Sequence, residues 1–194
     1  MARSERREAK IKNVLALRQP DLTIVMENIH DPHNVSAVLR SCDAVGVLRV
    51  ELLYTVEKFP RIGKKSSSSA NKWLELRKHT SVDECYTVLR KEGYAIVATF
   101  LGEFSHSLYD LDLTKKTALV FGNEHRGVSK EAARKADGNF QIPMNGMIQS
   151  LNVSVACAVA LYESLRQRIA AGELHRPKLE EAEFSALYNN WIER

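Results

Sequence analysis

Residues 22–54 have the sequence LTIVMENIHDPHNVSAVLRSCDAVGVLRVELLY, in which the spacing of apolar residues changes twice. Leu22–Met26 is a short apolar run bounded by turn residues, which is typical of a buried strand. From Asn34 to Ala44 the apolar residues recur at helical spacing, and Gly46 marks the end of the helix. Val47–Tyr54 is apolar again and predicts a second strand. The segment therefore predicts a strand–helix–strand unit.

The rest of the chain continues this alternation of strands and helices. We expect further strands at 73–76, 94–101, 117–121 and 140–142, and further helices at 81–91, 129–136 and 151–169. Strands that alternate with helices of this length form βαβ units and a largely parallel sheet. The sequence therefore predicts an α/β domain, with one helix before it at 3–18 and one after it at 180–191.

The length and composition of the chain fit one globular domain with short extensions. It has 194 residues, of which 44% are hydrophobic and 27% are charged. We find no apolar run of about 18 residues and no signal region after the charged start, so we expect a cytoplasmic protein. Cys42, Cys85 and Cys157 are widely spaced, and we expect them to be small buried residues rather than a disulfide or a zinc site.

Positive charge is concentrated in three segments, although the net charge of the chain is only +4. Residues 1–18 carry +4, residues 57–79 carry +5 and residues 166–178 carry +3, which leaves −8 for the other residues. A single basic segment is usually no more than a solvated surface. Three of them in an otherwise acidic chain indicate a polyanionic partner, and nucleic acid is the one we expect.

The first candidate binding segment is residues 34–46. Asn34 and Ser36 are residue types that cap helices, so a structural role would explain both. Arg40 lies on the same helix among apolar neighbours, and a guanidinium beside apolar surface needs an anion such as a phosphate or a carboxylate. Arg40 is therefore a candidate binding residue, and an ion pair within the chain is the alternative.

The second candidate segment is GNEHRGVS at 122–129, directly after a predicted strand. Glycines at the carboxyl end of a strand permit a tight turn and let a ligand approach the backbone. The spacing matches neither a Walker loop nor the dinucleotide fingerprint. A turn before a capped helix would also explain the glycines. His125 could act as a general base, although a turn histidine is more often merely exposed.

The third candidate segment is IPMNGMIQSLNVS at 142–154, where an irregular stretch leads into a helix. The first turn of that helix carries Ser150, Asn152 and Ser154. The free N–H groups at a helix start bind anions or carboxylates, so the segment can be both a helix cap and a ligand loop. The helix is apolar on more than one side, which indicates burial against a second subunit as well as the core.

These three segments, in this order and at this spacing, resemble the signature motifs of the SpoU class of RNA 2′-O-ribose methyltransferases, within the SPOUT superfamily. The resemblance covers essentially the whole chain. It implies a SPOUT α/β-knot, in which a parallel sheet has helices on both faces and the chain from about 117 to 169 forms a deep trefoil knot. It also implies S-adenosyl-L-methionine as the methyl donor, no metal ion, and a homodimer with the helix at 151–169 in its interface.

The resemblance also implies roles for individual residues. Arg40 looks like the essential arginine of the family, acting either as a base toward the ribose 2′-hydroxyl or as a clamp on an RNA phosphate. A guanidinium has a pKa above about 12, which favours the clamp. The residues that position the arginine, the ribose and the donor would be Asn34, Glu124, Ser150 and Asn152. The donor would bind to Thr99, Leu101, Gly122, Asn123, Glu124, Ile142, Met144 and Leu151.

The two ends of the chain resemble the family members that methylate guanosine 18 in the D-loop of tRNA. The division of the chain is then a tRNA-binding N-terminal helix at 1–20, a catalytic domain at 21–170 and a tRNA-binding extension at 171–194. The run Ser66–Ser69 departs from the family, in which glycine is common there. The expected RNA contacts are Arg6, Arg7, Lys10, Arg18, Lys72, Arg166, Arg168 and Arg176.

Two alternatives stay open, and neither DNA nor a membrane is an expected partner in either. The chain could be a ribosomal RNA methyltransferase of the same class, but many of those carry a separate RNA-binding domain first, whereas only a short helix precedes the first strand here. It could also be a non-catalytic RNA-binding module, against which the intact motif residues argue. A nicotinamide-dependent dehydrogenase would need a glycine fingerprint that this sequence lacks.

Overall fold

The protein is built around a single parallel sheet. The computed structural model describes residues 3–60, 70–102 and 105–194, so the serine run Ser66–Ser69 lies outside the described residues. In the described residues, seven strands pair in the order β3-β2-β1-β6-β4-β7-β5, and all their pairings are parallel. The strands are β1 (Leu22–Glu27), β2 (Arg49–Leu53), β3 (Glu75–His79), β4 (Ala95–Thr99), β5 (His106–Ser107), β6 (Thr117–Phe121) and β7 (Gly138–Gln141).

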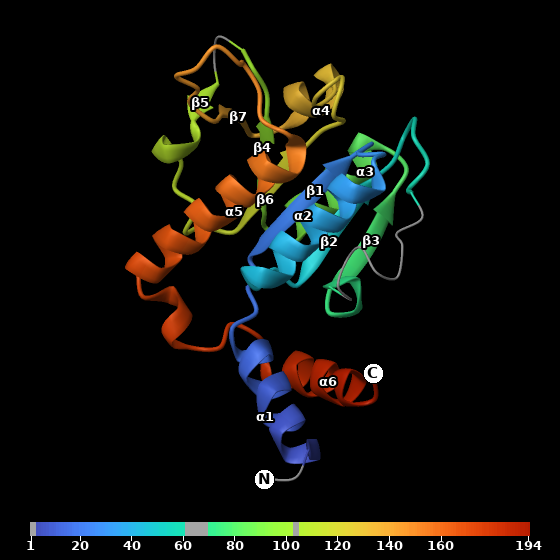
Figure 1. Ribbon diagram of the computed structural model, residues 1–194, viewed down its shortest axis with the longest axis vertical. Helices are drawn as coiled ribbons and strands as arrows, with labels where there is room; N and C mark the ends of the chain where they lie inside the picture. Colours follow the sequence, from blue (N-terminus) through green and yellow to red (C-terminus); the bar gives the residue numbers. More distant parts are fainter. Residues whose placement is uncertain (1–2, 61–69, 103–104) are drawn as a thin grey trace.

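Helices cover both faces of the sheet, as Figure 1 shows. α2 (Pro32–Ala44) and α5 (Val153–Ala170) pack together on one face, and α3 (Val82–Lys91) and α4 (Lys130–Lys135) lie on the other. Short 3₁₀ helices lie at Ala70–Lys72, Leu108–Asp110 and Glu173–His175. The α/β prediction is therefore confirmed. Among the described residues, no helix is both long and apolar enough to cross a bilayer.

The strands are buried on both sides, which explains why they read as continuous apolar runs. Leu22, Ile24 and Met26 of β1 face the α2–α5 layer, whereas Val25 faces the α3–α4 layer. Met26 is in register with Leu52 of β2 and with Phe121 of β6. The central strands therefore end at the same level.

Some predicted element bounds are shifted, and one shift matters for function. The helix predicted from Asn34 begins at Pro32, because Asp31 is its N-cap and accepts the N–H of His33 at 2.8 Å. Asn34 therefore lies inside the first turn, where its side chain does not cap the helix. The strands predicted at 73–76 and 140–142 lie at 75–79 and 138–141. The two-residue strand β5 is too short to produce a sequence pattern.

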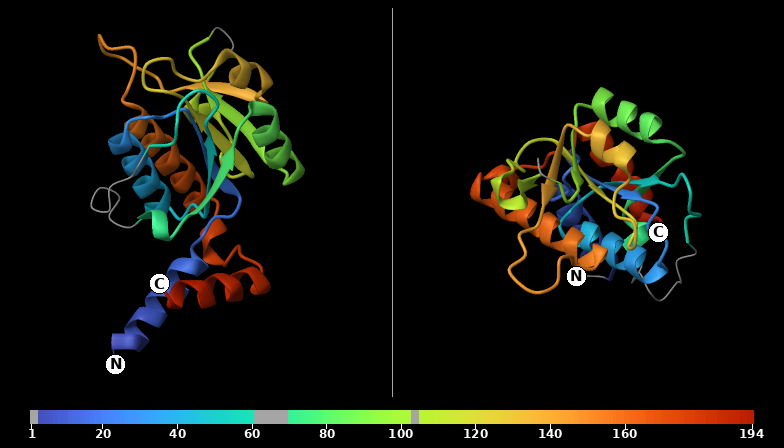
Figure 2. Two further views of the ribbon diagram at one scale, coloured as in Figure 1. Left: turned by 90° about the vertical axis from the view of Figure 1, so that its right-hand side faces the viewer. Right: turned by 90° about the horizontal axis from the view of Figure 1, so that it is seen from above.

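The two ends of the chain pack against each other. α1 (Arg3–Ala16) and α6 (Glu181–Ile192) cross beneath the sheet, as the left view of Figure 2 shows. Ile11, Leu15, Leu187 and Trp191 form a small buried cluster there with Leu48 from the core. The rings of Trp73 and Trp191 lie 5.1 Å apart. We call α1 and α6 the terminal unit, and it lies at the end of the sheet where β1 begins.

Two arginines predicted to contact RNA, Arg18 and Arg168, are corrected by the structure because both side chains are fully buried. Arg18 donates to the carbonyl of Val47 at 2.8 Å, forms an ion pair with Asp43 of α2 and lies over the ring of Trp191. Arg168 forms five hydrogen bonds within the protein, which are described below. Both guanidinium groups hold segments of the chain together and are not available to an RNA.

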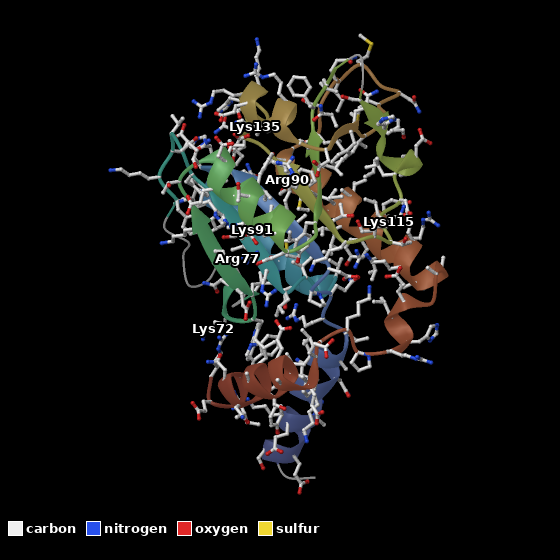
Figure 3. All side chains as sticks on the ribbon, turned by 180° about the vertical axis from the view of Figure 1, so that it is seen from behind. Lys72, Arg77, Arg90, Lys91, Lys115 and Lys135 are labelled. Carbon is white, nitrogen blue, oxygen red and sulfur yellow. The ribbon has the colours of Figure 1, made fainter. Side chains whose placement is uncertain are left out.

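Basic side chains on the α3–α4 face are also paired within the protein. Figure 3 shows Arg90 and Lys135 close together on this face. Arg90 pairs with Asp137 and Lys135 with Asp83, each at 2.8 Å. Arg77, which contributes to the charge of segment 57–79, pairs with the buried Glu51 and with Glu92. This part of the positive charge is therefore compensated internally.

The three cysteines, Cys42, Cys85 and Cys157, are buried and form no disulfide, as the sequence predicts. Cys42 of α2 and Cys157 of α5 belong to the cluster that holds these two helices on the sheet. Burial raises the pKa of Cys85 and of Cys157 above the ordinary thiol value. Both are therefore packing residues with little thiolate character at neutral pH.

Candidate functional site

A cavity of about 940 Å³ lies at the carboxyl ends of the central strands. Its walls come from five segments, at 30–34, 99–101, 121–128, 140–144 and 149–156. Four of these follow a strand, and the fifth leads into α5. This is the edge where parallel α/β sheets bind ligands, and the volume lies in the range of small-molecule sites.

The turn after β1 is held by the side chain of Asn28. Asn28 adopts φ 53°, a left-handed conformation that asparagine tolerates better than most residues. Its Oδ1 accepts the N–H groups of Thr55, Val56 and Glu57 at 3.0–3.1 Å. Its carbonyl accepts from Nδ2 of Asn123 at 2.8 Å. The turn after β1 is thereby fixed to the turn after β6.

The turn after β6 requires glycine for a steric reason. A Cβ atom on Gly122 would lie 2.1 Å from the carbonyl carbon of Gly127 and from the nitrogen of Val128. The main chains of Asn123 and Gly127 pair across the turn, and Oδ1 of Asn123 accepts the N–H of His125 at 3.0 Å. The backbone therefore folds back on itself and leaves no room for a side chain at residue 122.

Hydrogen bonds join the three sequence motifs at the mouth of the cavity. Nδ2 of Asn34 donates to Oε1 of Glu124 at 3.0 Å, and Oδ1 of Asn34 accepts from Nδ2 of Asn152 at 3.0 Å. Oδ1 of Asn152 accepts the N–H of Ser154 at 2.8 Å and so caps α5. The side-chain amides of Asn34 and Asn152 each face an acceptor with the nitrogen and a donor with the oxygen. The hydrogen bonds therefore determine which atom of each amide is oxygen and which is nitrogen.

The carboxylate of Glu124 is the acceptor at the end of this network. It also accepts the main-chain N–H groups of Asp31 at 3.2 Å and His30 at 3.4 Å. Burial by itself would raise the pKa of Glu124, but the hydrogen bonds from Asn34 and from these amides hold the pKa below its ordinary value. Glu124 is therefore ionised at neutral pH.

The structure brings nearly all the predicted site residues to this cavity, and Arg40 is the exception. Arg40 is exposed on α2 and does not line the cavity. It is six residues from Asn34, which places it about 9 Å further along the helix axis and about 120° around it. The residues that do line the cavity are Asn34, Thr99, Leu101, Gly122, Asn123, Glu124, Ile142, Met144, Ser150, Leu151 and Asn152.

Sequence reasoning missed some residues of the cavity wall. His30 precedes the Asp31–Pro32 helix start and forms part of the wall, as do Phe140 and Gln149. The sequence identifies the first of these only as a turn residue. Its position directly after the end of β1, at the edge where binding residues gather, is the signal that could have singled it out.

The remaining predicted RNA contacts are on the surface. Arg6, Arg7 and Lys10 are exposed on α1, and Lys72 and Arg176 are exposed elsewhere. Arg166 is exposed near the end of α5 and pairs with Glu163 of the same helix at 2.8 Å. All six can reach a polyanion, in contrast to the two buried arginines.

Comparison with known proteins gives consistent matches over the whole chain. Residues 21–162 match the model of the SpoU rRNA Methylase family. The tRNA (guanosine(18)-2′-O)-methyltransferase of Thermus thermophilus is 45% identical over 99% of this chain and 98% of its own length. The enzyme of that name from Escherichia coli K12 is 42% identical over 86% of this chain and 72% of its own length.

Solved structures are similar as well. The TrmH/SpoU tRNA modifying enzyme of A. aeolicus has a TM-score of 0.91 and 39% identity, covering 98% of this chain and 96% of that one. The SpoU methyltransferase AviRb of Streptomyces viridochromogenes, in complex with its cofactor AdoMet, has a TM-score of 0.68 and 28% identity. The match spans 81% of this chain and 62% of the AviRb chain.

Proposed function

The chain belongs to the SpoU rRNA methylase family, and we propose that it transfers a methyl group from S-adenosylmethionine to the ribose 2′-hydroxyl of guanosine 18 in tRNA. The observation that carries this proposal is the hydrogen-bonded chain Glu124–Asn34–Asn152, which unites the three motifs at one cavity. Relatives that align with almost the whole chain are named for this reaction.

The cavity fits S-adenosylmethionine. Phe121, Phe140 and Ile142 supply an apolar wall suited to an adenine ring, and Gly122 allows the tight turn that forms the neighbouring part of the wall. The carboxylate of Glu124 supplies the negative charge that a cationic donor requires. The donor, when bound, provides an electrophilic methyl group on a positively charged sulfur.

The residues of this chain contribute mainly by alignment. Asn34 and Asn152 hold the Glu124 carboxylate and the start of α5 in fixed positions, and alignment of nucleophile and donor is the largest help available to a methyl transfer. Arg40, exposed beside the site on α2, clamps an RNA phosphate. The chain from about 117 to 169 carries the trefoil knot that family membership implies.

The protein acts as a homodimer through α5. Val155, Tyr162 and Ile169 are seven residues apart and are 47%, 54% and 58% exposed, so they form an apolar stripe along one side of the helix. Exposed apolar stripes of this kind mark interfaces. A second copy of α5 carries the same seven-residue spacing of apolar side chains, so it can pack against this stripe and bury it.

The deciding experiment measures methyl transfer. The protein is incubated with labelled S-adenosylmethionine and an unmodified tRNA transcript, and the methylated ribose is mapped. We expect label on guanosine 18. Transfer to ribosomal RNA fragments but to no tRNA would favour the ribosomal alternative, and transfer to neither would favour the non-catalytic one.

Gly122→Ala is expected to weaken donor binding at least tenfold. A Cβ atom 2.1 Å from backbone atoms cannot be relieved by a side-chain rotation, so the turn that forms the cavity wall has to move. Isothermal titration with S-adenosylmethionine measures the effect. Gly146→Ala is the control, because a Cβ there meets nothing within 4 Å. Equal affinities of the two variants would contradict the fit described above.

The terminal unit contributes tRNA affinity, in the cytoplasm where tRNA is found. It lies at the end of the sheet where β1 begins (Figure 1), whereas the cavity lies at the carboxyl ends of the strands. Replacing Arg6, Arg7 and Lys10 together by Gln is expected to weaken tRNA binding and to lower the slope of log K against log salt by up to about 0.9 per lost phosphate contact. Donor affinity should not change. Lys115→Gln, whose ammonium pairs with Asp112, is the control. An unchanged slope in the triple variant would exclude α1 from the RNA surface.

A further inference from the structure

His30 stands at the mouth of the cavity with its ring beside the central carboxylate. Its side chain is 46% exposed, and the residue lines the cavity wall. Nδ1 lies 3.2 Å from Oε2 of Glu124, and the main-chain N–H of His30 lies 3.4 Å from the same oxygen. Glu124 therefore holds this histidine through its ring and its backbone together.

The contact with Glu124 determines which nitrogen of His30 carries the proton. Because the hydrogen-bonded Glu124 is an ionised acceptor, Nδ1 at 3.2 Å must be a donor, and an unprotonated Nδ1 would face the carboxylate with its lone pair. Nδ2 of Asn123 also lies 3.3 Å from Nδ1 and donates one of its two hydrogens to the carbonyl of Asn28 at 2.8 Å, so a neutral hydrogen bond from Asn123 to Nδ1 is the competing arrangement. A charge-assisted bond is the stronger of the two, so the proton belongs on Nδ1.

A proton on Nδ1 leaves Nε2 of His30 as an acceptor. Among the described residues, the hydrogen bonds of this ring all involve Nδ1. The other charged or titratable groups around the ring are His125, whose ring centroid is 5.8 Å away, and Asp31 next in the chain. Arg126, in the same turn as His125, is paired with Glu57 at 2.7 Å.

We propose that His30 accepts the proton of the ribose 2′-hydroxyl through Nε2, with Glu124 as the residue that positions its ring. This inference rests on the proposed function. In the step, the 2′-oxygen forms a bond to the methyl carbon while the carbon–sulfur bond breaks and its electron pair stays on sulfur. The hydroxyl proton goes to Nε2, and the resulting imidazolium is stabilised by the Glu124 carboxylate. Charge and atoms balance, and the products are a 2′-O-methyl ribose and a neutral thioether.

This assignment accounts for the proton in a way that Arg40 does not. A guanidinium stays protonated in proteins and has no lone pair to offer, and Arg40 is outside the cavity wall. A neutral imidazole oriented by a carboxylate is the usual arrangement of a general base near pH 7. The two residues then have separate tasks, since Arg40 binds phosphate and His30 takes the proton.

The first test needs no activity. ¹⁵N chemical shifts of the histidine rings in the protein without ligands report the tautomer of His30. We expect the Nδ1–H form, and Glu124→Gln should remove that preference. An Nε2–H form of His30 in the unaltered protein would overturn the proposal.

The second test is the pH dependence of methyl transfer in single turnover. The rate of the unaltered protein should rise with pH along a single inflection, as expected when one group must be unprotonated to accept the hydroxyl proton. His30→Gln should transfer methyl groups about 10²–10⁴ times more slowly and without that inflection, while its affinities for S-adenosylmethionine and tRNA stay within a few-fold. His106→Gln, an exposed histidine outside the cavity wall, is the matched control and should keep the profile.

The outcomes separate this inference from the proposed function. If the unaltered protein and the control both transfer methyl groups and His30→Gln keeps the inflection, the role of His30 is overturned. The proposed function is not affected by that result. Absence of transfer by the unaltered protein to every RNA would overturn the proposed function and this role with it. Should His30→Gln fail to fold, as judged by circular dichroism, the tautomer measurement on the unaltered protein still decides.

Discussion

Arg168→Met is expected to lower the free energy of unfolding by about 3–5 kcal/mol, which is the usual loss when one partner of a buried ion pair is removed. Each of its N–H groups has an acceptor. Nε donates to the carbonyl of Leu113. One terminal nitrogen donates to the side chains of Gln19 and Asp21, and the other donates to the carbonyls of Asp21 and Lys115. The five donor–acceptor distances are 2.6–3.2 Å. Methionine fills similar space but donates no hydrogen bond, so the carbonyl of Leu113 and Oε1 of Gln19 lose the bonds from Arg168, and the Asp21 carboxylate keeps its ion pair with Lys178.

Urea denaturation of Arg168→Met and Arg166→Met provides the comparison. Arg166 is two residues away on α5, is exposed, and pairs only locally with Glu163, so its replacement should change stability by no more than about 1 kcal/mol. If both variants lost the same small amount, Arg168 would have no structural role. The sequence treats these two arginines as equivalent RNA contacts, and the measurement distinguishes them.

The loss in Arg168→Met should also depend on pH. Burial would raise the pKa of Asp21, but the hydrogen bond from Lys178 and the charge of Arg168 hold it below the ordinary value of 3.8. A lowered pKa in the folded state stabilises the protein above about pH 4, and this contribution disappears as the pH falls through the folded pKa. The difference between the unaltered protein and the variant should therefore be largest above pH 4 and shrink below it.

Asn34→Asp is expected to reduce methyl transfer by about 10²–10³-fold in kcat/KM, comparable to the loss of one essential hydrogen-bond donor in other active sites. The side chain keeps its size, but the N–H group that donates to Glu124 at 3.0 Å becomes a second carboxylate oxygen. Two carboxylates in contact repel each other, so Glu124 leaves its position or takes up a proton. In the first case the motifs are no longer joined at Glu124, and in the second case Glu124 loses its negative charge.

Steady-state methylation of a tRNA transcript measures this effect. Asn145→Asp makes the same chemical change at an exposed residue that does not line the cavity, and it should retain full activity. Asn34→Asp should also retain the unfolding midpoint within a few degrees, because Asn34 lies in the first turn of α2, beside the cavity. An Asn34→Asp enzyme with normal kcat/KM would show that the network does not support the reaction.

Sequence patterns predicted much of the fold and the site for identifiable reasons. β1 and β6 are buried on both faces, so their apolar runs are continuous and easy to recognise. The sequence indicates Gly122 and Asn152 as binding residues because they lie at a strand end and at a helix start, where binding residues gather, and both line the cavity. The strand β5 is not predicted from the sequence, because two residues are too few to show an alternation of apolar and polar side chains.

The terminal unit could not be predicted from periodicity. α1 and α6 each show an amphipathic pattern, but which face of one meets which face of the other depends on the path of the chain between them. Their contact is made through Trp191, Leu187, Ile11 and Leu15, which are far apart in sequence. The sequence describes two appendages, whereas the structure has one packed unit.

The sequence by itself determined the α/β class, the three motifs and their family, because these depend on local spacing and on residue types at strand ends. Only the tertiary structure decided which arginines face solvent. The sequence around an arginine does not show whether its partner is an RNA phosphate or, as for Arg168, Asp21 from a distant part of the chain. It also decided that His30 stands beside Glu124, 94 residues away. Long-range neighbours of this kind follow from how the strands pair, and no local pattern encodes them.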